Sequence, residues 1–385
     1  MTKILPYARQ SINKSDIDAV KSALKSEMIT RGEIVEQFEK AVAEYCNVKY
    51  AVAFNSGTAS LQAAYQSVNL NPNDRLITTP NTFVSTAGAA IQRGVNPIFV
   101  DIDRDSGNMD LEAVQLNQYK SFTRGRTVIV PVHFAGNPVD MEAMNRFLRD
   151  PDTIIIEDAS HAWGATYKDG QKMGSCPWSD MTIFSLHPAK NITMGEGGVV
   201  TTNNPDLYEL LKRFRNNGIV KKEEESPWHY DVVELSGNYH VTDFSAALGM
   251  NQLKRLDEFV EKRRKLVKIY REKLAKVPHI NLFSEEYDAI SGCHLFVVQI
   301  DFDHYETNRT DVMNALKEKG VGSQYHYIPI YRFSFLKYKA GDLSEYFPEM
   351  EDYYRQGLSL PLYYDLTEEN VAHVADSLCK VLGCK

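Results

Sequence analysis

The stretch FSLHPAKNITMGEGG, residues 184–198, contains one lysine, Lys190, between two apolar runs. Residues 181–184 and 199–202 are predicted to be short β-strands, and the glycines between them predict a turn. A lysine at a strand end, near backbone N–H groups and a hydroxyl, can form a Schiff base with a carbonyl compound. The stretch therefore favours a reactive amine at this position, although an ordinary loop lysine would fit the same residues taken alone.

Length and composition are those of a two-domain globular protein. The chain has 385 residues, 43% hydrophobic and 24% charged, which is ordinary for a water-soluble fold. Its net charge of −8 argues against nucleic-acid or anionic-membrane partners, because these require an excess of cations. The five cysteines form no CxxC pair, so we expect reduced thiols. We find neither the pattern of a signal peptide nor a membrane-spanning run, and expect a soluble cytoplasmic protein.

Strands and helices are predicted to alternate through the first part of the chain. The expected strands are residues 50–54, 75–79, 97–100, 127–132 and 153–156, and the expected helices are residues 15–26 (with Ser15 as N-cap), 33–46, 62–68, 84–93, 111–116 and 141–148. This rhythm predicts a mainly parallel sheet covered by helices on both faces. Since ligands of such sheets bind at the carboxyl ends of the strands, we expect the functional site there.

The sequence NSGTASL, residues 55–61, follows the first predicted strand. A strand that leads through small residues into a helix offers unpaired N–H groups and the positive end of the helix dipole to an anion. Gly57, Thr58 and Ala59 are therefore candidates for a phosphate site, and Ser185 is a candidate for adding a hydroxyl. A plain tight turn with a Ser or Thr cap is the alternative.

A carboxylate and a histidine follow another apolar run, in the sequence EDASHAWG, residues 157–164. A carboxylate at a strand end can keep the ring nitrogen of pyridoxal phosphate protonated, so that the ring accepts electrons from a carbanion. Asp158 is the candidate for this role, His161 for a hydrogen bond to the phenolic oxygen and Phe83 for stacking on the ring. Alone, Asp158 would more often be a helix cap and Phe83 a core aromatic. No second ligand lies four residues from His161, so we expect no metal.

The second part of the chain is predicted to contain a smaller domain. Residues 244–275 have the pattern of one long helix that would bridge two domains. A strand at 293–301 and helices at 308–319 and 368–382 then predict an α+β unit. We therefore expect a large domain of residues 1–250, packed closely against a small C-terminal domain of residues 251–385.

Four motifs occur in one order along the chain: NSGTASL, EDASHAWG, SLHPAKNITMGEGG and GNYHVTDFSAALGMNQL, the last being residues 237–253. In this order and spacing the chain resembles the DegT/DnrJ/EryC1/StrS family of pyridoxal-phosphate-dependent nucleotide-sugar aminotransferases, from Tyr7 to the C-terminal helix. The resemblance implies an α/β fold of the fold-type-I aminotransferase class, with a large domain around a mainly parallel mixed sheet and a smaller C-terminal α+β domain. It also implies a homodimer with active sites at the subunit interface.

The same resemblance implies roles for individual residues. Lys190 would carry pyridoxal 5′-phosphate covalently, with the pyridoxamine 5′-phosphate form arising during turnover, and Asp158 would pair with the pyridine nitrogen. The other implied cofactor contacts are His161 near the ring oxygen, the stacking Phe83, the phosphate-site residues Gly57, Thr58, Ala59 and Ser185, and Asn238, which would reach the phosphate from the partner subunit.

Three stretches, VPVHFAGNPVDM, FSLHPAKNITMGEGG and SQYHYIPIYRFSFLK, resemble the branch of the family that aminates C4 of a ketosugar in pseudaminic acid synthesis. In that branch glutamate and a UDP-linked 2-acetamido-2,6-dideoxy-4-ketohexose give UDP-4-amino-4,6-dideoxy-N-acetyl-β-L-altrosamine. The positions that match its substrate contacts are Tyr7, Glu27, Met28, Ile29, Thr30, His326, Tyr327, Ile328, Pro329 and Tyr331. From the residues alone, the aromatic run 325–331 would suit either a uracil and sugar contact or a strand with a packed aromatic face.

Two positions depart from the family pattern. Asn217 stands before Gly218 where many relatives have a histidine, and His240 stands where an arginine is common. An aminotransferase acting on another UDP- or dTDP-keto-sugar, at C3 or C4, is therefore the alternative function. A sugar dehydratase is disfavoured because those relatives replace the lysine with histidine. A DNA-binding regulator is disfavoured because the chain has neither spare length nor positive charge for it.

Overall fold

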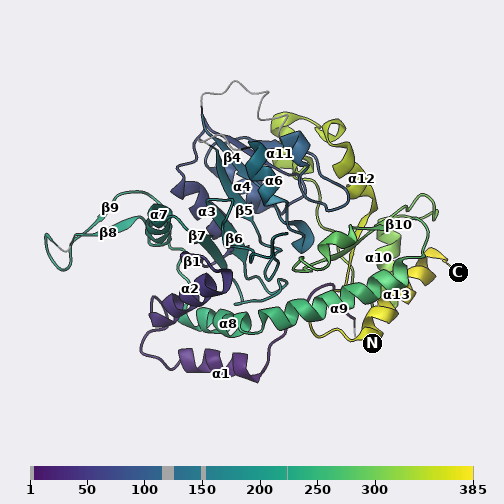
Figure 1. Ribbon diagram of the computed structural model, residues 1–385, viewed down its shortest axis with the longest axis horizontal. Helices are drawn as coiled ribbons and strands as arrows, with labels where there is room; N and C mark the ends of the chain where they lie inside the picture. Colours follow the sequence, from purple (N-terminus) through teal and green to yellow (C-terminus); the bar gives the residue numbers. More distant parts are fainter. Residues whose placement is uncertain (1–3, 115–124, 149–152, 223, 385) are drawn as a thin grey trace.

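The computed structural model of the protein describes residues 4–114, 125–148, 153–222 and 224–384 (Figure 1). Its largest element is a seven-stranded sheet with the strand order β1-β7-β6-β5-β4-β2-β3. The strands are β1 (Tyr50–Phe54), β2 (Arg75–Thr78), β3 (Pro97–Phe99), β4 (Thr127–Val130), β5 (Ile154–Asp158), β6 (Met181–Ser185) and β7 (Gly198–Thr202). The neighbours from β3 to β6 pair in parallel, and β7 runs antiparallel to both β6 and β1. The predicted α/β fold with a mainly parallel sheet is confirmed.

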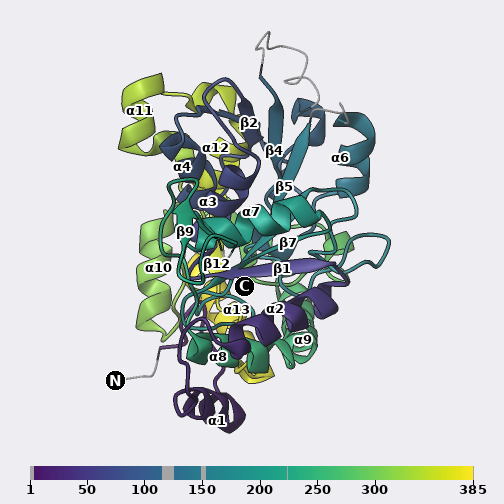
Figure 2. The same ribbon diagram turned by 90° about the vertical axis from the view of Figure 1, so that its left-hand side faces the viewer.

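Alternate residues of each strand enter two different hydrophobic cores, because successive side chains of a strand point to opposite faces. In β1, Ala51 and Ala53 face one core, whereas Val52 and Phe54 face the other. Both faces are covered by helices, as Figure 2 shows for α2 and α7 on either side of β1. The helices of this part are α1 (Lys14–Ala23), α2 (Glu33–Cys46), α3 (Gly57–Ser67), α4 (Val84–Gln92), α6 (Met141–Leu148), α7 (Pro205–Arg215) and α8 (Asp243–Leu253). Burial on both faces explains why the strands are nearly continuous apolar runs.

The first helix begins differently from the prediction, which named Ser15 as its N-cap. Asn13 is the N-cap, and its side chain accepts from the N–H of Asp16 at 3.0 Å while the Asp16 carboxylate accepts from the N–H of Asn13 at 2.9 Å. Asp16 is fully buried and also accepts from Asn251 and Gln252 of α8. This reciprocal cap uses the third helical residue, and the helix starts at Lys14, two residues earlier than a Ser15 cap would place it.

The long helix predicted for residues 244–275 is wrong in one respect: it is broken into α8 and α9 (Leu256–Leu274). Arg255 has non-helical backbone angles at the break, and its guanidinium lies 4.5 Å from the centre of the Phe259 ring and 3.3 Å from the Asp16 carboxylate. Neither glycine nor proline marks the position. Contacts distant in sequence therefore accompany the break, and the apolar spacing could not indicate it.

The C-terminal part has a core of its own. A three-stranded sheet in the order β10-β11-β12 packs with α9, α10 and α13 around residues such as Val298, Leu316 and Leu378. Its elements are β10 (Ile280–Leu282), β11 (Phe296–Ile300), α10 (Arg309–Glu318), α11 (Ser334–Ala340), α12 (Pro348–Gln356), β12 (Gly357–Leu360) and α13 (Glu368–Leu382). The predicted domain boundary at residue 250 falls inside α8 and stays a prediction.

The run 325–331 is not a strand, so that alternative is wrong. It forms an extended segment that ends in a 3-10 helix at Ile330–Arg332.

Two further features lie outside the cores. A hairpin of β8 (Ile219–Lys221) and β9 (Tyr230–Val232) projects from the body (Figure 1). Among the described helices, none combines the length and the apolar character needed to cross a membrane.

Gly198, at the start of β7, lets the turn after β1 lie against the sheet. A Cβ at this position would lie 2.4 Å from the carbonyl oxygen of Ser56 and 2.4 Å from Ser60 Oγ. Gly198→Ala should therefore lower the free energy of unfolding by about 1–3 kcal/mol in a denaturant titration. Gly88→Ala, inside α4 with only a Val84 methyl at 4.0 Å, is the control and should raise it by roughly 0.5–1 kcal/mol. Equal effects of the two substitutions would contradict the packing described.

Candidate active site

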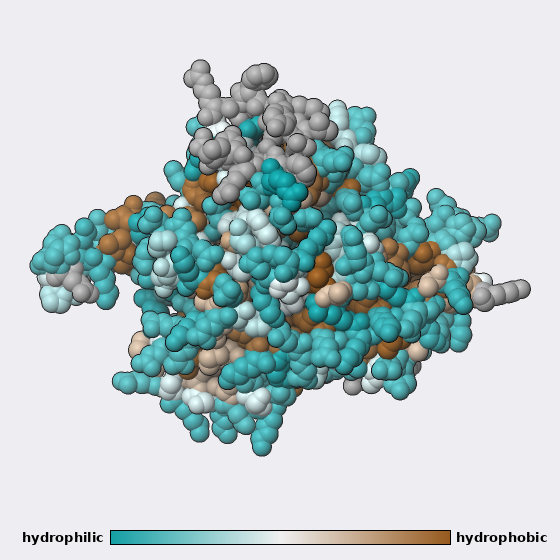
Figure 3. Space-filling view, viewed as in Figure 1, coloured by the Kyte–Doolittle hydropathy of each residue, from teal (hydrophilic) through white to brown (hydrophobic). Residues whose placement is uncertain are grey.

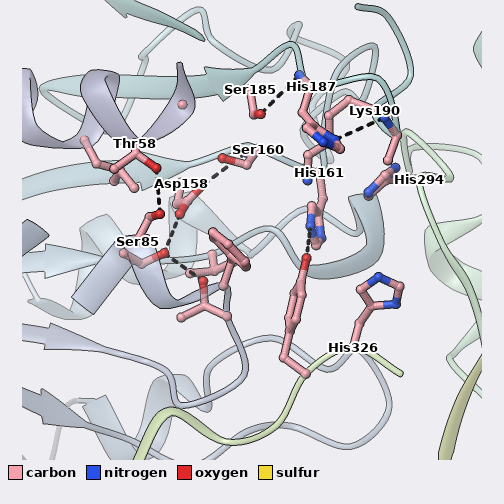
Figure 4. Close-up of a pocket in the computed structure, with 18 of the residues that line it drawn as sticks. Thr58, Ser85, Asp158, Ser160, His161, Ser185, His187, Lys190, His294 and His326 are labelled. Carbon is pink, nitrogen blue, oxygen red and sulfur yellow. Dashed lines mark hydrogen bonds between the residues drawn. The ribbon is translucent and has the colours of Figure 1, made fainter. Parts of the chain in front are cut away.

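A cavity of about 510 Å³ opens where the parallel strands end, as predicted for this class of sheet (Figure 4). It is lined by segments that follow β1, β2, β5 and β6, together with Tyr7 near the N-terminus and residues 294 and 324–327 of the C-terminal part. The polar and aromatic residues that line it are Tyr7, Ser56, Thr58, Thr82, Phe83, Ser85, Thr86, Asp158, Ser160, His161, Ser185, His187, Lys190, Glu196, His294, Gln324, Tyr325, His326 and Tyr327. The sequence-predicted lysine, carboxylate and phosphate site are therefore brought together.

Lys190 lies on the turn between β6 and β7 and lines this cavity. The turn is fixed by the hydrogen bond from the Lys190 N–H to the His187 carbonyl at 2.9 Å and by the Thr193 hydroxyl, which donates to the Leu186 carbonyl at 2.9 Å. Burial lowers the pKa of Lys190 to about 8, against the opposing effect of the Asp158 charge. A buried amine with such a pKa carries a substantial neutral, nucleophilic fraction near neutral pH.

Asp158 ends β5 and is almost completely buried, with 3% of its surface exposed. Its Oδ1 accepts from the Ser160 N–H at 3.1 Å, and its Oδ2 accepts from the Thr86 hydroxyl at 2.7 Å. Phe83 immediately precedes α4, lines the cavity and is 57% exposed. An exposed aromatic in a cavity is unusual for a core residue, so the structure disfavours the core alternative for Phe83.

Glu157, beside Asp158, points to the opposite face of the strand and holds its end in place. Its carboxylate contacts His133 Nε2 at 2.9 Å and accepts from the Tyr167 hydroxyl at 2.8 Å. Burial alone would raise the pKa of Glu157, but hydrogen bonds from His133, Ser179 and Tyr167 leave this pKa below its ordinary value. The buried carboxylate is thus stabilised as an anion and anchors the strand end that carries Asp158.

The predicted phosphate site lies at the N-terminus of α3, close to β6. Ser56 caps the helix by accepting from the Ala59 N–H at 3.1 Å. A Cβ on Gly57 would lie 3.2 Å from Ser185 Oγ, so the hydroxyl is beside this turn as predicted. Ala59 is different from the expectation: its side chain is buried and its N–H is occupied by Ser56, so it does not line the cavity. Thr58 Oγ1 instead meets Ser85 Oγ at 2.7 Å.

Two buried histidines lie side by side next to Lys190, with ring centres 4.5 Å apart. His161 Nδ1 accepts from the Ala135 N–H at 3.3 Å, so the proton of the neutral ring is on Nε2, which donates to the Tyr327 hydroxyl at 2.9 Å. Burial and the Lys190 charge lower the pKa of both His161 and His294 well below the ordinary value. Both rings are therefore neutral at physiological pH.

The comparisons with known proteins agree with this site. A family model described as the DegT/DnrJ/EryC1/StrS aminotransferase family matches residues 10–379. The chain belongs to this family. It is 36% identical over 379 residues to the UDP-4-amino-4,6-dideoxy-N-acetyl-beta-L-altrosamine transaminase of Campylobacter jejuni, with 98% of each chain covered.

Solved structures of other aminotransferases have the same fold. Helicobacter pylori PseC, an aminotransferase involved in the biosynthesis of pseudoaminic acid, has a TM-score of 0.91 and 29% sequence identity, covering 99% of this chain and 100% of its own. Spr1654 of Streptococcus pneumoniae, described as a sugar aminotransferase in its PLP form, has a TM-score of 0.87 and 26% identity over 99% of each chain. The predicted fold-type-I architecture and aminotransferase class are confirmed.

In this aminotransferase the residues expected to contact substrate divide into two groups. Tyr7, His326 and Tyr327 line the cavity, and the Tyr7 and His326 rings lie 5.3 Å apart. Ile328, Pro329 and Tyr331 do not line it, and the Tyr331 hydroxyl instead donates to Glu351 at 2.7 Å.

The remaining expected residues lie away from the cavity of their own chain. Thr30 pairs with Thr242 at the start of α8, and the residues before it, Glu27, Met28 and Ile29, are exposed. Asn238 pairs with Asn216 beyond α7, and it also does not line the cavity. The contact of Asn238 with the phosphate of a partner subunit and the substrate contacts of residues 27–30 stay predictions.

Several lining residues were missed by sequence reasoning. His294 comes just before β11 in an apolar context, CHLFVV, that suggests only a core position. Its Nδ1 is buried without a hydrogen-bond partner in the described part of the chain. Ser85 and Thr86 follow Phe83 directly, and Ser160 lies between Asp158 and His161, so closeness to predicted residues was their only indication. Within the described ranges, no three His, Cys, Asp or Glu residues form a group that could hold a metal ion.

The reactivity of Lys190 should reveal its lowered pKa directly. In competitive labelling of the cofactor-free protein with acetic anhydride, only the neutral amine reacts, so Lys190 labelling should rise through a midpoint near pH 8. An ordinary lysine has a midpoint near pH 10.4. Exposed Lys268 on α9 serves as the internal reference. A Lys190 midpoint at the ordinary value would show that its amine is solvated.

Proposed function

We propose that this aminotransferase transfers the amino group of glutamate to C4 of a UDP-linked 2-acetamido-2,6-dideoxy-4-ketohexose. The product would be UDP-4-amino-4,6-dideoxy-N-acetyl-β-L-altrosamine, an intermediate of pseudaminic acid synthesis. The observation that carries this proposal is the end-to-end relation to the Campylobacter jejuni transaminase, 36% identical with 98% of each chain covered. The Helicobacter pylori PseC fold, with a TM-score of 0.91, supports it.

The cofactor is pyridoxal 5′-phosphate, which is the cofactor of this family and is present in the PLP form of the Spr1654 structure. The cavity has the groups that this molecule needs: the Lys190 amine, the Asp158 carboxylate, and the α3 N-terminus with Gly57 beside Ser185. Bound there, the cofactor would supply an electron sink for the carbon that loses its proton.

The residues of the site would then perform a transamination in two halves. Lys190 would hold the cofactor covalently until the amino donor displaces the lysine. The freed Nζ would then take the proton from the donor's α-carbon. In the second half the same amine would move the proton that the sugar carbon C4 receives. Its pKa of about 8 suits both tasks, because a base close to ambient pH accepts and returns protons readily. Asp158 would orient the cofactor through its ring nitrogen, and Phe83 would cover one face of the ring.

Tyr7, His326 and Tyr327 would bind the sugar nucleotide at the other wall of the cavity. Burial and the Lys190 charge lower the pKa of His326 to about 3, so its ring is neutral and can donate or accept a hydrogen bond. Its Nδ1 contacts the Ser359 hydroxyl at 2.8 Å, which fixes the ring orientation. Neutral polar and aromatic groups of this kind suit hydroxyls and a uracil base.

The test of this function is a panel of substrates. Incubation with glutamate and UDP- or dTDP-linked ketosugars, followed by product identification, should give an amine at C4 of the UDP-linked 2-acetamido-2,6-dideoxy-4-ketohexose. Lys190→Ala, which lacks the base, should lose activity by at least about 1,000-fold. Amination of a dTDP sugar or of a C3 ketone only would favour the alternative substrate and leave the reaction class intact. No amination of any ketosugar would contradict the proposal.

We propose further that the active protein is a homodimer. The hairpin of β8 and β9 and the segment after it expose Trp228, Tyr230 and Leu235, with 79%, 57% and 91% of their surfaces accessible. Figure 3 shows hydrophobic residues on the part of this projecting arm nearer the body and hydrophilic residues at its tip. Exposed large hydrophobic side chains gathered in one segment are typical of an interaction surface. A second copy would also bring Asn238 and residues 27–30 to a cavity that they do not reach in their own chain.

Substitutions on the arm test the homodimer. The double variant Trp228→Ser, Leu235→Ser should shift the protein toward monomer in sedimentation velocity, because the apolar contact area is lost. Tyr346→Ser, which changes another exposed aromatic (66%) far along the chain in a 3-10 helix, is the control and should leave the dimer intact. A wild-type protein that sediments as a monomer at micromolar concentration would contradict the assembly.

A further inference from the structure

Two threonine hydroxyls form a buried chain that ends on Asp158. Thr86 Oγ1 lies 2.7 Å from Asp158 Oδ2, and Thr82 Oγ1 lies 2.7 Å from Thr86 Oγ1. Thr82, Thr86 and Asp158 expose 3%, 1% and 3% of their surfaces. No part of the reaction described above requires either hydroxyl, so their role is open.

The direction of these two hydrogen bonds follows from the Asp158 carboxylate on which they end. An ionised carboxylate can only accept hydrogen bonds, so the Thr86 proton must point at Asp158. The oxygen of Thr86 is then free to accept the Thr82 proton, which makes Thr82 the donor of the second bond. On the other side of the carboxylate, the Ser160 N–H donates to Oδ1 at 3.1 Å. Each oxygen of Asp158 is thus held by one donor and keeps room for a second.

Thr86 belongs to the same helical turn as Phe83. The Thr86 N–H donates to the Phe83 carbonyl at 3.2 Å, in the first turn of α4. A β-branched side chain has few rotamers in a helix, so the position of this hydroxyl is set by the backbone of α4. One turn of helix therefore places both the aromatic ring that lines the cavity and the hydroxyl that holds the carboxylate.

We propose that Thr86 is a positioning residue of the active site: its hydroxyl fixes the plane of the Asp158 carboxylate so that the carboxylate meets the ring nitrogen of the cofactor. Thr82 donates a hydrogen bond to the Thr86 oxygen and so helps to orient the Thr86 hydroxyl. The inference rests on the proposed function only for the cofactor, pyridoxal phosphate, and not for the sugar. A purely structural alternative is that the two hydroxyls satisfy each other's hydrogen bonds in a buried place.

Three variants separate these roles: Thr86→Val, which keeps the shape and loses the hydroxyl, Thr86→Ser, which keeps the hydroxyl, and Thr82→Val. The readouts are the dissociation constant of pyridoxal phosphate for the cofactor-free protein, the pH dependence of the absorbance of the loaded protein, and the melting temperature of the cofactor-free protein. A hydrogen bond to a charged group is worth enough to expect about a tenfold weaker cofactor affinity for Thr86→Val. Thr86→Ser should stay within about threefold of wild type, and Thr82→Val should fall between the two.

An altered absorbance profile in Thr86→Val, restored in Thr86→Ser, would support the positioning role. Unchanged affinity and absorbance in Thr86→Val, with only a lower melting temperature, would overturn it in favour of the structural alternative. A wild-type protein that binds no pyridoxal phosphate would overturn both this inference and the proposed cofactor chemistry. A wild-type protein that binds the cofactor but aminates no UDP-sugar would defeat the proposed substrate alone, because cofactor affinity still reports on Thr86.

Discussion

The burial of the Lys190 amine is the constraint on which the rest of the site depends. An amine taken out of water loses much of its tendency to hold a proton, and here burial brings its pKa to about 8. Only the carboxylate of Asp158 opposes this effect among the causes of the shift. The nearby histidines are kept neutral by burial and by the same lysine charge. The site therefore places an amine of lowered pKa beside the carboxylate of Asp158, which is the combination that a cofactor with a protonated ring and a reactive carbonyl requires.

The C-terminal part of the chain forms part of the site and is hydrogen-bonded to it. Asn191, next to the reactive lysine, donates to the Gly292 carbonyl at 2.6 Å, and the His294 N–H donates to the Ala135 carbonyl at 2.9 Å. Ala135 in turn donates to His161 through its own N–H. Hydrogen bonds thus join the turn that carries Lys190, the segment that carries His161 and the segment before β11. Residues far apart in the sequence form one wall here, and Ala135 and Leu295 belong to the same hydrophobic cluster.

Structural features that depend on local sequence pattern could be predicted. Features that depend on contacts between residues distant in the sequence could not. Buried strands were recognisable as apolar runs, and Lys190 and Asp158 as polar residues at their ends, since parallel strands end on one edge of the sheet. The break before Leu256 accompanies the contacts of Arg255 with Asp16 and Phe259, which no spacing of apolar residues could indicate. His294 was missed because a lone histidine at the start of an apolar strand is usually a core residue. The positions expected to contact the sugar, such as residues 27–30 and 326–329, lie outside the regular helices and strands, so the sequence could suggest them only through resemblance.

The central claim is that the Lys190 amine is the group that holds pyridoxal phosphate. Borohydride treatment of the loaded protein fixes the cofactor to the amine that binds it, and peptide mapping by mass spectrometry then identifies that residue. We expect a single modified peptide, containing residues 184–198 with the added mass on Lys190. Modification of a different lysine, or no modification of a protein that has bound the cofactor, would contradict it.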